Sequence, residues 1–399
     1  MIRHLFKLAW NRKRTNLLVI AEIVASFLVV FAVATTALYF AGSWRRPVGF
    51  DRRDVMDVRL RMGGHRFGMA RSEEDVAALK RILEEVKGID GVVAAAGALT
   101  VPYGEVTMHC GFEVEGREPQ PLCDVVTDDY REVLGLEVVR GRWFEEADSG
   151  LGVEPVVIDE NLAREAYGDQ DPIGRTVRGV FGKESEVRVV GVVREFRKDG
   201  ELTPRGPFMF GRARVGDPNE DPPQSLVLKL RPGLDASFEE ALAKRLHALA
   251  PDWSFEIRRM DQMREEYLRA YTIPLVVGGI VAAFLMLMVA LGLFGVLWQN
   301  VIRRTGEIGL RRAMGAGEAD IARQFLGEVA VVTTLGLVVG VVLAAQVPLL
   351  GYFDFVRTRV FVAGIAASAA LIYLLALTCG VYPGILAART RPAEALHQE

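Results

Sequence analysis

The residues best suited to a specific interaction form a charged run that extends from Arg303 to Ala316. Within it, Glu307 and Arg311 are four positions apart with the acidic residue first, the favourable order for an ion pair on a helix. We interpret ten residues of this run as a binding site for a cytoplasmic partner protein: Arg303, Arg304, Glu307, Ile308, Leu310, Arg311, Arg312, Met314, Gly315 and Ala316. The alternative is a basic helix that rests on anionic lipid headgroups.

Glycines and acidic residues predict a bend directly after this run. Gly315 and Gly317 interrupt the helical pattern. Glu318 and Asp320 then occupy the first turn of a following helix, where negative charge is favourable beside the positive end of the helix dipole. The pattern therefore predicts a short, charged helical elbow between two longer helices. Such an elbow could receive the motion of a docked partner and pass it on.

The sequence lacks the patterns typical of catalytic and metal-binding sites. A Gly-x-x-x-x-Gly-Lys-Ser/Thr run would cradle nucleotide phosphates, but none occurs in the 399 residues, and the nearest fragment is Gly182-Lys183. The five histidines and three cysteines are scattered along the chain, which does not favour a metal site. A net charge of -3 does not indicate a nucleic-acid surface. We predict a non-catalytic chain with no catalytic residues and no metal or cofactor of its own.

Four apolar stretches are long enough to place the elbow at a membrane surface. They are separated by polar segments, and crossing the hydrocarbon core takes about 20 residues. The first stretch is too long for a signal peptide, so we interpret it as a retained anchor. The predicted spans cover residues 17–42, 272–301, 329–350 and 360–387.

Basic residues favour one orientation of these spans. They are concentrated in the short segments before the first span, between the second and third, and after the fourth, namely residues 1–16, 302–328 and 388–399. Because short cytoplasmic segments are enriched in lysine and arginine, both termini and the elbow are predicted to be cytoplasmic. Residues 43–270 then lie on the opposite side of the membrane.

Residues 43–270 have the pattern of a soluble α/β domain. A strand–helix–strand unit is predicted near each of its ends, and the helices of the two units begin at Ser72 and Asp235. Together these units suggest one subdomain built from residues 54–101 and 225–259, with an inserted, mostly β subdomain at 102–224. From Met260 onwards apolar residues recur at helical spacing, which predicts a stalk helix that continues into the second span.

Three other features have two interpretations each. Cys110 and Cys123 flank a predicted turn, but a simple hairpin register does not pair them directly, so both a disulfide and two free thiols remain open. Glu22, near the inner end of the first span, either marks a proton or substrate path or reaches water at the interface. Glycines in the second span permit close packing, either with a second chain or within this one.

Several motifs resemble the permeases of MacB/FtsX-like (type VII) ABC transporters. The elbow sequence Glu-Ile-Gly-Leu-Arg-Arg-Ala-Met-Gly-Ala is similar to the loop that follows the second span in that family. Unlike full-length MacB, this sequence contains no fused nucleotide-binding domain. The resemblance extends over nearly the whole chain, through Ile321, Gln324, Phe325, Glu328, Tyr382-Pro383, Ala387–Arg389, Pro392, Glu394–Leu396, Gly141–Phe144, Val157–Glu160, Asp171–Gly174 and Val189–Val193.

The resemblance implies a fold and a set of partners. The fold is an α/β membrane protein with four transmembrane helices and a large periplasmic α+β domain between helices 1 and 2. That domain would consist of a porter-like subdomain with an inserted, mostly β subdomain. The chain would pair with a second permease chain, identical or different, in a bacterial inner membrane. A separate ABC nucleotide-binding subunit would bind ATP and Mg, and a periplasmic adaptor and outer-membrane channel are further candidate partners.

The resemblance also implies a function. The chain is expected to be a permease subunit that converts ATP-driven motion of the nucleotide-binding subunit into periplasmic movement for export or extraction of a substrate. Drugs, peptides, lipids and lipoproteins are all compatible with the sequence. A second hypothesis is an FtsX-like signalling subunit that activates a periplasmic cell-wall hydrolase, or reports to a sensor, without moving a substrate. A third, a membrane-anchored binding protein with no ATPase partner, is disfavoured by the elbow motif.

Overall fold

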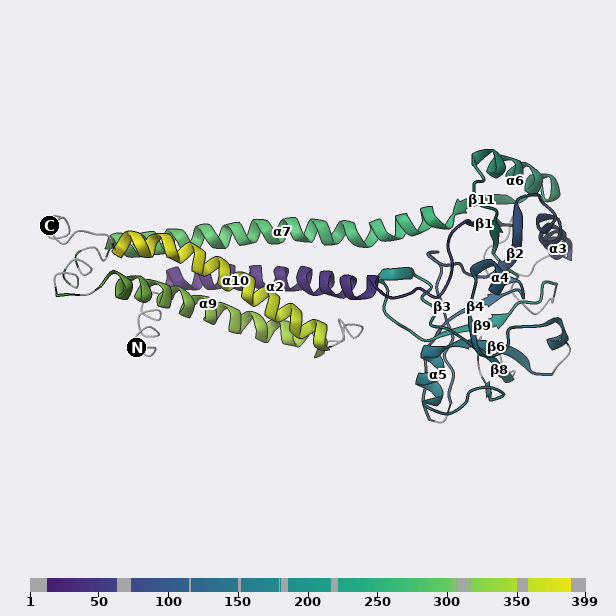
Figure 1. The fold of residues 1–399 in the computed structure, drawn as a ribbon, viewed down its shortest axis with the longest axis horizontal. Coiled ribbons are helices and arrows are strands. Elements are labelled where there is room, and N and C mark those ends of the chain that lie inside the picture. Colours follow the sequence, from purple (N-terminus) through teal and green to yellow (C-terminus); the bar gives the residue numbers. More distant parts are fainter. Residues whose placement is uncertain are drawn as a thin grey trace. The chain divides into compact units, whose positions relative to one another are not determined.

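The computed structural model describes residues 13–62, 73–114, 116–149, 152–178, 180, 186–216, 222–303, 306, 310, 314–315, 317–349 and 358–388. The chain divides into two compact units (Figure 1). One, which we call the helical unit, comprises Met1–Gly42 and Tyr271–Glu399. The other, the α/β unit, comprises Ser43–Ala270. Two helices, α2 and α7, continue from one unit into the other.

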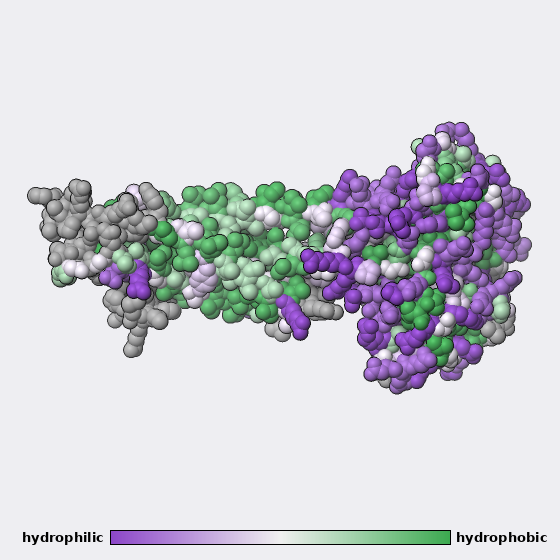
Figure 2. Space-filling model, in the orientation of Figure 1, coloured by the Kyte–Doolittle hydropathy of each residue, from purple (hydrophilic) through white to green (hydrophobic). Residues whose placement is uncertain are grey.

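The helical unit is built from long apolar helices. Within the described residues these helices are α2 (Lys13–Trp44), α7 (Met260–Arg303), α9 (Glu318–Leu349) and α10 (Thr358–Ala388). Each contains a stretch that is long and apolar enough to cross a membrane, so the described residues include four candidate membrane helices, the number predicted. The surface of this unit is largely hydrophobic, as expected for side chains that face lipid (Figure 2).

Small residues allow the helices of this unit to approach closely. A Cβ atom on Gly336 of α9 would lie 2.6 Å from Ile23 Cγ2 of α2, and one on Gly340 would lie 2.6 Å from Phe27 Cδ1. Ile23 and Phe27 are completely buried. Because lipid is as apolar as the helix surfaces, such close van der Waals packing is a main source of helix association in membranes. The α2–α9 contact therefore depends on these glycines.

The α/β unit is organised around one large mixed sheet. In the described residues its strand order is β11-β1-β10-β2-β4-β9-β6-β8-β5, with β3 on β4 and β7 on β8. In chain order the strands are β1 (Val55–Arg61), β2 (Val92–Ala98), β3 (Met108–His109), β4 (Leu122–Val126), β5 (Val138–Gly141), β6 (Glu154–Asp159), β7 (Thr176–Arg178), β8 (Glu186–Val193), β9 (Phe208–Arg212), β10 (Ser225–Leu230) and β11 (Ser254–Arg259). The helices of the unit are α3 (Glu73–Lys87), α4 (Tyr130–Leu134), α5 (Glu160–Tyr167) and α6 (Ala236–Leu249).

Four strands, β11, β1, β10 and β2, form what we call the first half of the sheet, and they pair antiparallel. Helices α3 and α6 share a core with them, in which Leu79 and Ile82 of α3 and Leu242 and Leu246 of α6 are buried. Asp235 caps α6 by accepting a hydrogen bond from the Ser237 amide at 3.0 Å. The two strand–helix–strand units were predicted from the sequence, and the structure confirms both, with α3 and α6 beginning one residue after Ser72 and Asp235.

The strands β4, β9, β6, β8 and β5, with β3, β7 and α5, form what we call the inserted half. The β4–β9 and β6–β8 pairs are parallel, and the other pairs in this half are antiparallel. The sequence predicts an inserted, mostly β subdomain here, and in the structure its strands extend the sheet of the first half. The connection is narrow, because β2 and β4 pair only at Ala98 and Val126 within the described residues. The amide of Leu99, the residue after β2, also donates a hydrogen bond to the Val125 carbonyl at 3.0 Å.

Cys110 and Cys123 form a disulfide with a Cα–Cα separation of 6.0 Å. Cys123 is opposite Met108 in the β3–β4 ladder rather than opposite Cys110, so the two cysteines are diagonal neighbours. The simple hairpin register therefore does not pair them directly, as expected, yet the diagonal distance is within reach of a disulfide. This resolves the alternatives left open by the sequence in favour of the disulfide.

Candidate coupling site

The predicted elbow lies between α7 and α9. Arg303 is the last residue of α7, and Leu310, Met314 and Gly315 are described individually. The remaining predicted partner-binding residues lie outside the described residues: Arg304, Glu307, Ile308, Arg311, Arg312 and Ala316. The structure thus describes the two ends of the elbow and the exposure of Leu310 and Met314 within it.

Two large apolar side chains of the elbow are exposed to solvent. Leu310 is 55% exposed and Met314 is 73% exposed. They are one helical turn apart, since the Met314 amide donates a hydrogen bond to the Leu310 carbonyl at 3.0 Å. Gly315 follows with a φ of +96°, a conformation that ends a helix and that glycine adopts without strain. An apolar pair displayed beside a sharp turn is suited to insertion into a partner's groove.

The two ends of the elbow are packed together. Val301, near the end of α7, is in one buried cluster with Ile321 and Phe325, near the start of α9. Their exposed fractions are 7% or less. Close packing at this point joins the end of α7 to the start of α9, and close-packed interiors have low compressibility.

The other end of α7 is held in the α/β unit by charged side chains. We call residues Met260–Ala270 of α7 the stalk segment. Arg264 Nε in this segment donates to Glu201 Oε1 at 2.7 Å, and Tyr103 Oη donates to Glu201 Oε2 at 3.2 Å. Arg52 Nη1 lies 3.8 Å from the same carboxylate. Burial by itself raises the pKa of Glu201, but these arginines outweigh it, so the pKa lies below its usual value and the carboxylate is charged at neutral pH.

Contacts around this carboxylate also include the end of α2. The Arg264 guanidinium lies over the Trp44 ring, 5.4 Å from its centroid. Arg197, a buried residue in the loop between β8 and β9, donates to the Ser43 carbonyl at 3.2 Å. The rings of Tyr103 and Tyr267 are 5.9 Å apart. The end of α2 and the stalk segment of α7 therefore contact the same small region of the α/β unit.

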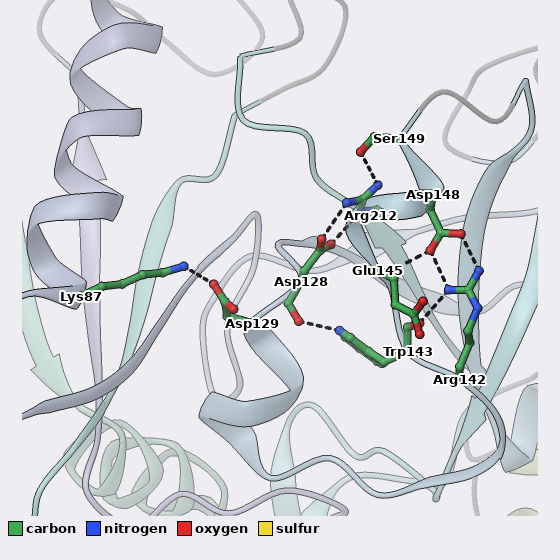
Figure 3. A network of polar contacts seen from close by, with 9 residues as sticks. All are labelled: Lys87, Asp128, Asp129, Arg142, Trp143, Glu145, Asp148, Ser149 and Arg212. Carbon is green, nitrogen blue, oxygen red and sulfur yellow. Dashed lines mark hydrogen bonds and ion pairs between the residues drawn. The ribbon is translucent and has the colours of Figure 1, made fainter.

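A further polar network surrounds the turn between β4 and α4 (Figure 3). Arg212 of β9 makes a two-pronged contact with Asp128, at 2.7 and 2.6 Å, and Trp143 Nε1 donates to the Asp128 carbonyl at 2.8 Å. Lys87 of α3 pairs with Asp129, which links the first half to the inserted half. The Lys87–Asp129 pair is half-exposed and contributes little stability. The network fixes the β4–α4 turn beside the narrow connection of the sheet.

The elbow remains a predicted binding site, and Glu201 was not among the residues predicted from the sequence. Glu201 and Arg264 are 63 positions apart in the sequence, so no local spacing of residues indicates their contact. The one available signal was compositional. The loop after β8 contains Arg197, Lys198 and Glu201 within five residues, and all three are at least nine-tenths buried. Within the described residues no group of three or more metal-ligating side chains is found.

Comparisons with known proteins agree with this architecture. Residues 16–245 match the MacB-like periplasmic core domain, and residues 279–392 match the FtsX-like permease C-terminal domain. A macrolide export ATP-binding/permease protein MacB from Neisseria gonorrhoeae is 28% identical over 283 residues, which cover 69% of this chain and 43% of that protein. One from Bdellovibrio bacteriovorus is 25% identical over 432 residues, which cover 100% of this chain and 62% of that protein.

A solved structure of the periplasmic region of MacB from Actinobacillus actinomycetemcomitans is 16% identical and covers 56% of this chain and 97% of that one, with a TM-score of 0.39. The chain spans less than two thirds of the length of the curated relatives that it matches. The match to the periplasmic core domain alone covers more than half of the chain, and the permease match covers most of the rest. The protein therefore belongs to the family of multi-pass membrane permeases that combine a MacB-like periplasmic core domain with an FtsX-like permease region.

Proposed function

We propose that this protein is the permease subunit of an ABC transporter whose ATPase is a separate chain. ATP and Mg would be bound by that nucleotide-binding subunit, and its closure would push on the elbow between α7 and α9. The permease would convert this push into movement of the α/β unit, for export or extraction of a substrate. The α/β unit would be periplasmic, and both termini would lie in the cytoplasm.

The single observation that carries this proposal is the uninterrupted course of α7. The helix begins at Met260, directly after β11, and ends at Arg303, where the elbow starts. Its 44 residues correspond to about 66 Å at ~1.5 Å per residue, roughly twice the hydrocarbon thickness of a bilayer. A continuous helix of this length can carry a displacement from one side of a membrane to a sheet on the other side. The exposed pair Leu310 and Met314 at its cytoplasmic end supplies an apolar anchor for the motor.

The disulfide supports the proposed placement of the α/β unit. Structural disulfides form and persist mainly outside the cytoplasm, and Cys110 and Cys123 are both in this unit. The basic residues of the segments around the elbow favour the same orientation.

Docking at the elbow is tested by co-purification of the full-length chain with its nucleotide-binding subunit, followed by an ATPase assay. We expect Leu310→Asp and Met314→Asp each to reduce recovery of that subunit at least tenfold, because a carboxylate would replace an apolar contact worth about 1.5–3 kcal/mol. Glu307→Arg is expected to act in the same direction, since it removes the predicted pair with Arg311.

The matched control is Val93→Asp, which places the same charge at an apolar side chain of the α/β unit that is 56% exposed. It should leave recovery and ATPase activity unchanged. Equal recovery of the nucleotide-binding subunit with wild type, Leu310→Asp and Met314→Asp would overturn docking at the elbow.

A further inference from the structure

The two halves of the sheet are attached to the stalk in different ways. In the first half, β11 ends at Arg259 and α7 begins at Met260, so strand and stalk are one continuous piece of chain. The inserted half follows β2 and precedes β10, so its main chain joins the first half and not the stalk. Any direct contact that holds the inserted half to the stalk segment must therefore involve side chains rather than a continuous main chain.

One such contact is made by a loop between β8 and β9; Met260 and Met263 of the stalk segment also lie in a buried cluster with Phe196 and Phe208. We call residues Arg197–Thr203 the grip loop, and it contains a short 3-10 helix, Gly200–Leu202. Arg197, Lys198 and Glu201 are each at least nine-tenths buried, although charged side chains are rarely buried unless they are paired. Their burial in a loop needs a structural reason, and each of the three binds a different neighbouring segment.

Arg197 holds the end of α2 and also shapes its own loop. It donates to the Ser43 carbonyl at 3.2 Å and to the carbonyls of Glu201 and Thr203 at 2.8 and 2.6 Å. Lys198 donates to the Val106 carbonyl at 2.7 Å. These contacts make the loop rigid, because one buried cation satisfies several main-chain carbonyls at once.

Glu201 holds the stalk segment. It accepts from Arg264 at 2.7 Å, and the Arg264 side chain is 19% exposed while that of Glu201 is 9% exposed. Such a shielded, charge-assisted pair is much less screened by water and salt than a surface pair. Tyr103, which donates to the same carboxylate, has a φ of 60° and packs against Gly200. A non-glycine residue held in the left-handed region at this place indicates that the local geometry is enforced by its surroundings.

We propose that the grip loop makes the inserted half follow the stalk, and that Glu201 is the positioning residue through which displacement of α7 changes the angle between the two halves of the sheet. This inference rests on the proposed function, since it assumes that α7 is driven. The narrow connection at Ala98 and Val126 is the natural place for the angle to change, because β1 and β10 pair at five positions whereas β2 and β4 pair at one in the described residues.

The test uses the full-length chain with its nucleotide-binding subunit in lipid nanodiscs. Spin labels are placed at Glu84→Cys in α3 and Glu165→Cys in α5, two exposed positions in the first and inserted halves, in a Cys379→Ala background. The distance between the labels is measured by pulsed electron paramagnetic resonance with and without a non-hydrolysable ATP analogue. We expect the analogue to shift the distance in the wild-type background.

Glu201→Gln and Arg264→Gln should each reduce that shift to less than half. The double variant should be no worse than either single variant, because both changes remove one shared contact. The matched control is Arg269→Gln in the same helix. Arg269 pairs with Glu265 on the surface, and their side chains are 69% and 67% exposed, respectively. In this control variant the ATP analogue should shift the distance between the labels as much as in wild type. Co-purification with the nucleotide-binding subunit is measured for every variant, so that loss of folding or docking is recognised separately.

The outcomes separate this inference from the proposed function. If the analogue fails to move the labels in the wild-type background, the proposed ATP-driven motion is wrong and the inference falls with it. If it moves them equally in wild type and in Glu201→Gln and Arg264→Gln, the proposed function stands and the grip loop has no part in transmission. A reduced shift in both single variants with retained co-purification supports the inference.

Discussion

At the residue scale, the Gly141–Phe144 motif is explained by the architecture of the fold. Gly141 has a φ of +69°, and a Cβ atom there would lie 2.3 Å from the Val190 carbonyl oxygen. Trp143 and Phe144 are buried in the core that spans the narrow connection of the sheet. Arg142 pairs with Asp148, whose side chain is 1% exposed. The motif therefore stabilises the inserted half, which accounts for its presence without a role in recognition.

The Arg142–Asp148 pair provides a prediction at this scale. Arg142 binds both carboxylate oxygens of Asp148, at 2.7 and 2.5 Å, and this hydrogen-bonded pairing lowers the pKa of Asp148 below its usual value. Arg142→Ala would leave a buried charge without its hydrogen-bonding counter-ion and should destabilise the α/β unit by about 1.5–3 kcal/mol. Hydrogen exchange of the strands β5, β6 and β8, measured by mass spectrometry on the full chain, should accelerate at least tenfold.

The control is Arg178→Ala at the exposed pair with Glu186, whose side chains are 77% and 37% accessible. Its effect should be below about 1 kcal/mol, because water replaces the lost partner. Equal effects of the two substitutions would show that burial of Asp148 contributes nothing to the strength of the Arg142 contact.

The sequence indicates candidate residues where spacing is local and does not indicate contacts between distant residues. The elbow was recognisable because Glu307 and Arg311 are one helical turn apart and glycines follow. The contact of Glu201 with Arg264 could not be found this way, since it depends on how a loop of the inserted half folds against the stalk. The same applies to the cysteine pair, where the diagonal geometry depends on the register of β3 against β4.

At the scale of elements, the helices and the strands of the first half follow from periodicity alone. Buried residues recur at helical spacing in α3, and Asp235 supplies a cap for α6 in the expected position. The connection between β2 and β4 does not follow from the sequence. It pairs strands across an insertion of the chain, and nothing in the pattern of either strand specifies the neighbour. For this reason the sequence indicates an inserted, mostly β subdomain but not which strand of the first half it pairs with.

The packing of α2 against α9 gives a prediction at this scale. Gly340→Leu would place a side chain where Phe27 Cδ1 lies 2.6 Å from the position of the new Cβ atom. Such overpacking costs about 1–3 kcal/mol, which exceeds the roughly 1 kcal/mol that leucine gains over glycine in helix propensity. The variant should unfold at a lower denaturant concentration than wild type when the purified chain in mild detergent is titrated with sodium dodecyl sulfate.

Gly279→Leu in α7 is the matched comparison, because no atom lies within 4 Å of the position of its Cβ. It should be as stable as wild type or slightly more so. A loss of stability at Gly279 that depends on protein concentration would instead reveal a second chain packed against this face of α7. Unchanged stability of Gly340→Leu would contradict the close approach of α9 to α2.

At the scale of the whole molecule, the charge distribution and the disulfide agree on an orientation in the membrane, and the surface hydropathy identifies the unit that lies outside the bilayer. Basic residues are concentrated in the segments around the elbow and at the termini, which favours their placement in the cytoplasm. The disulfide belongs to the α/β unit, where an oxidising compartment would preserve it. The surface of the α/β unit is largely hydrophilic, whereas that of the helical unit is hydrophobic (Figure 2). The charge distribution and the disulfide have different physical origins, so their agreement is informative.

This orientation is tested with single cysteines in a Cys379→Ala background, since the two remaining cysteines are bonded to each other. Leu310→Cys should react with a membrane-impermeant maleimide only after the cytoplasmic membrane is permeabilised, because the proposed orientation places the elbow in the cytoplasm. Glu84→Cys in α3 should react in spheroplasts with an intact membrane. Both positions are exposed, so accessibility within the protein does not limit either reaction. Labelling of Leu310→Cys from outside would place the elbow on the wrong side for any nucleotide-driven motor and would refute the proposed route of force along α7.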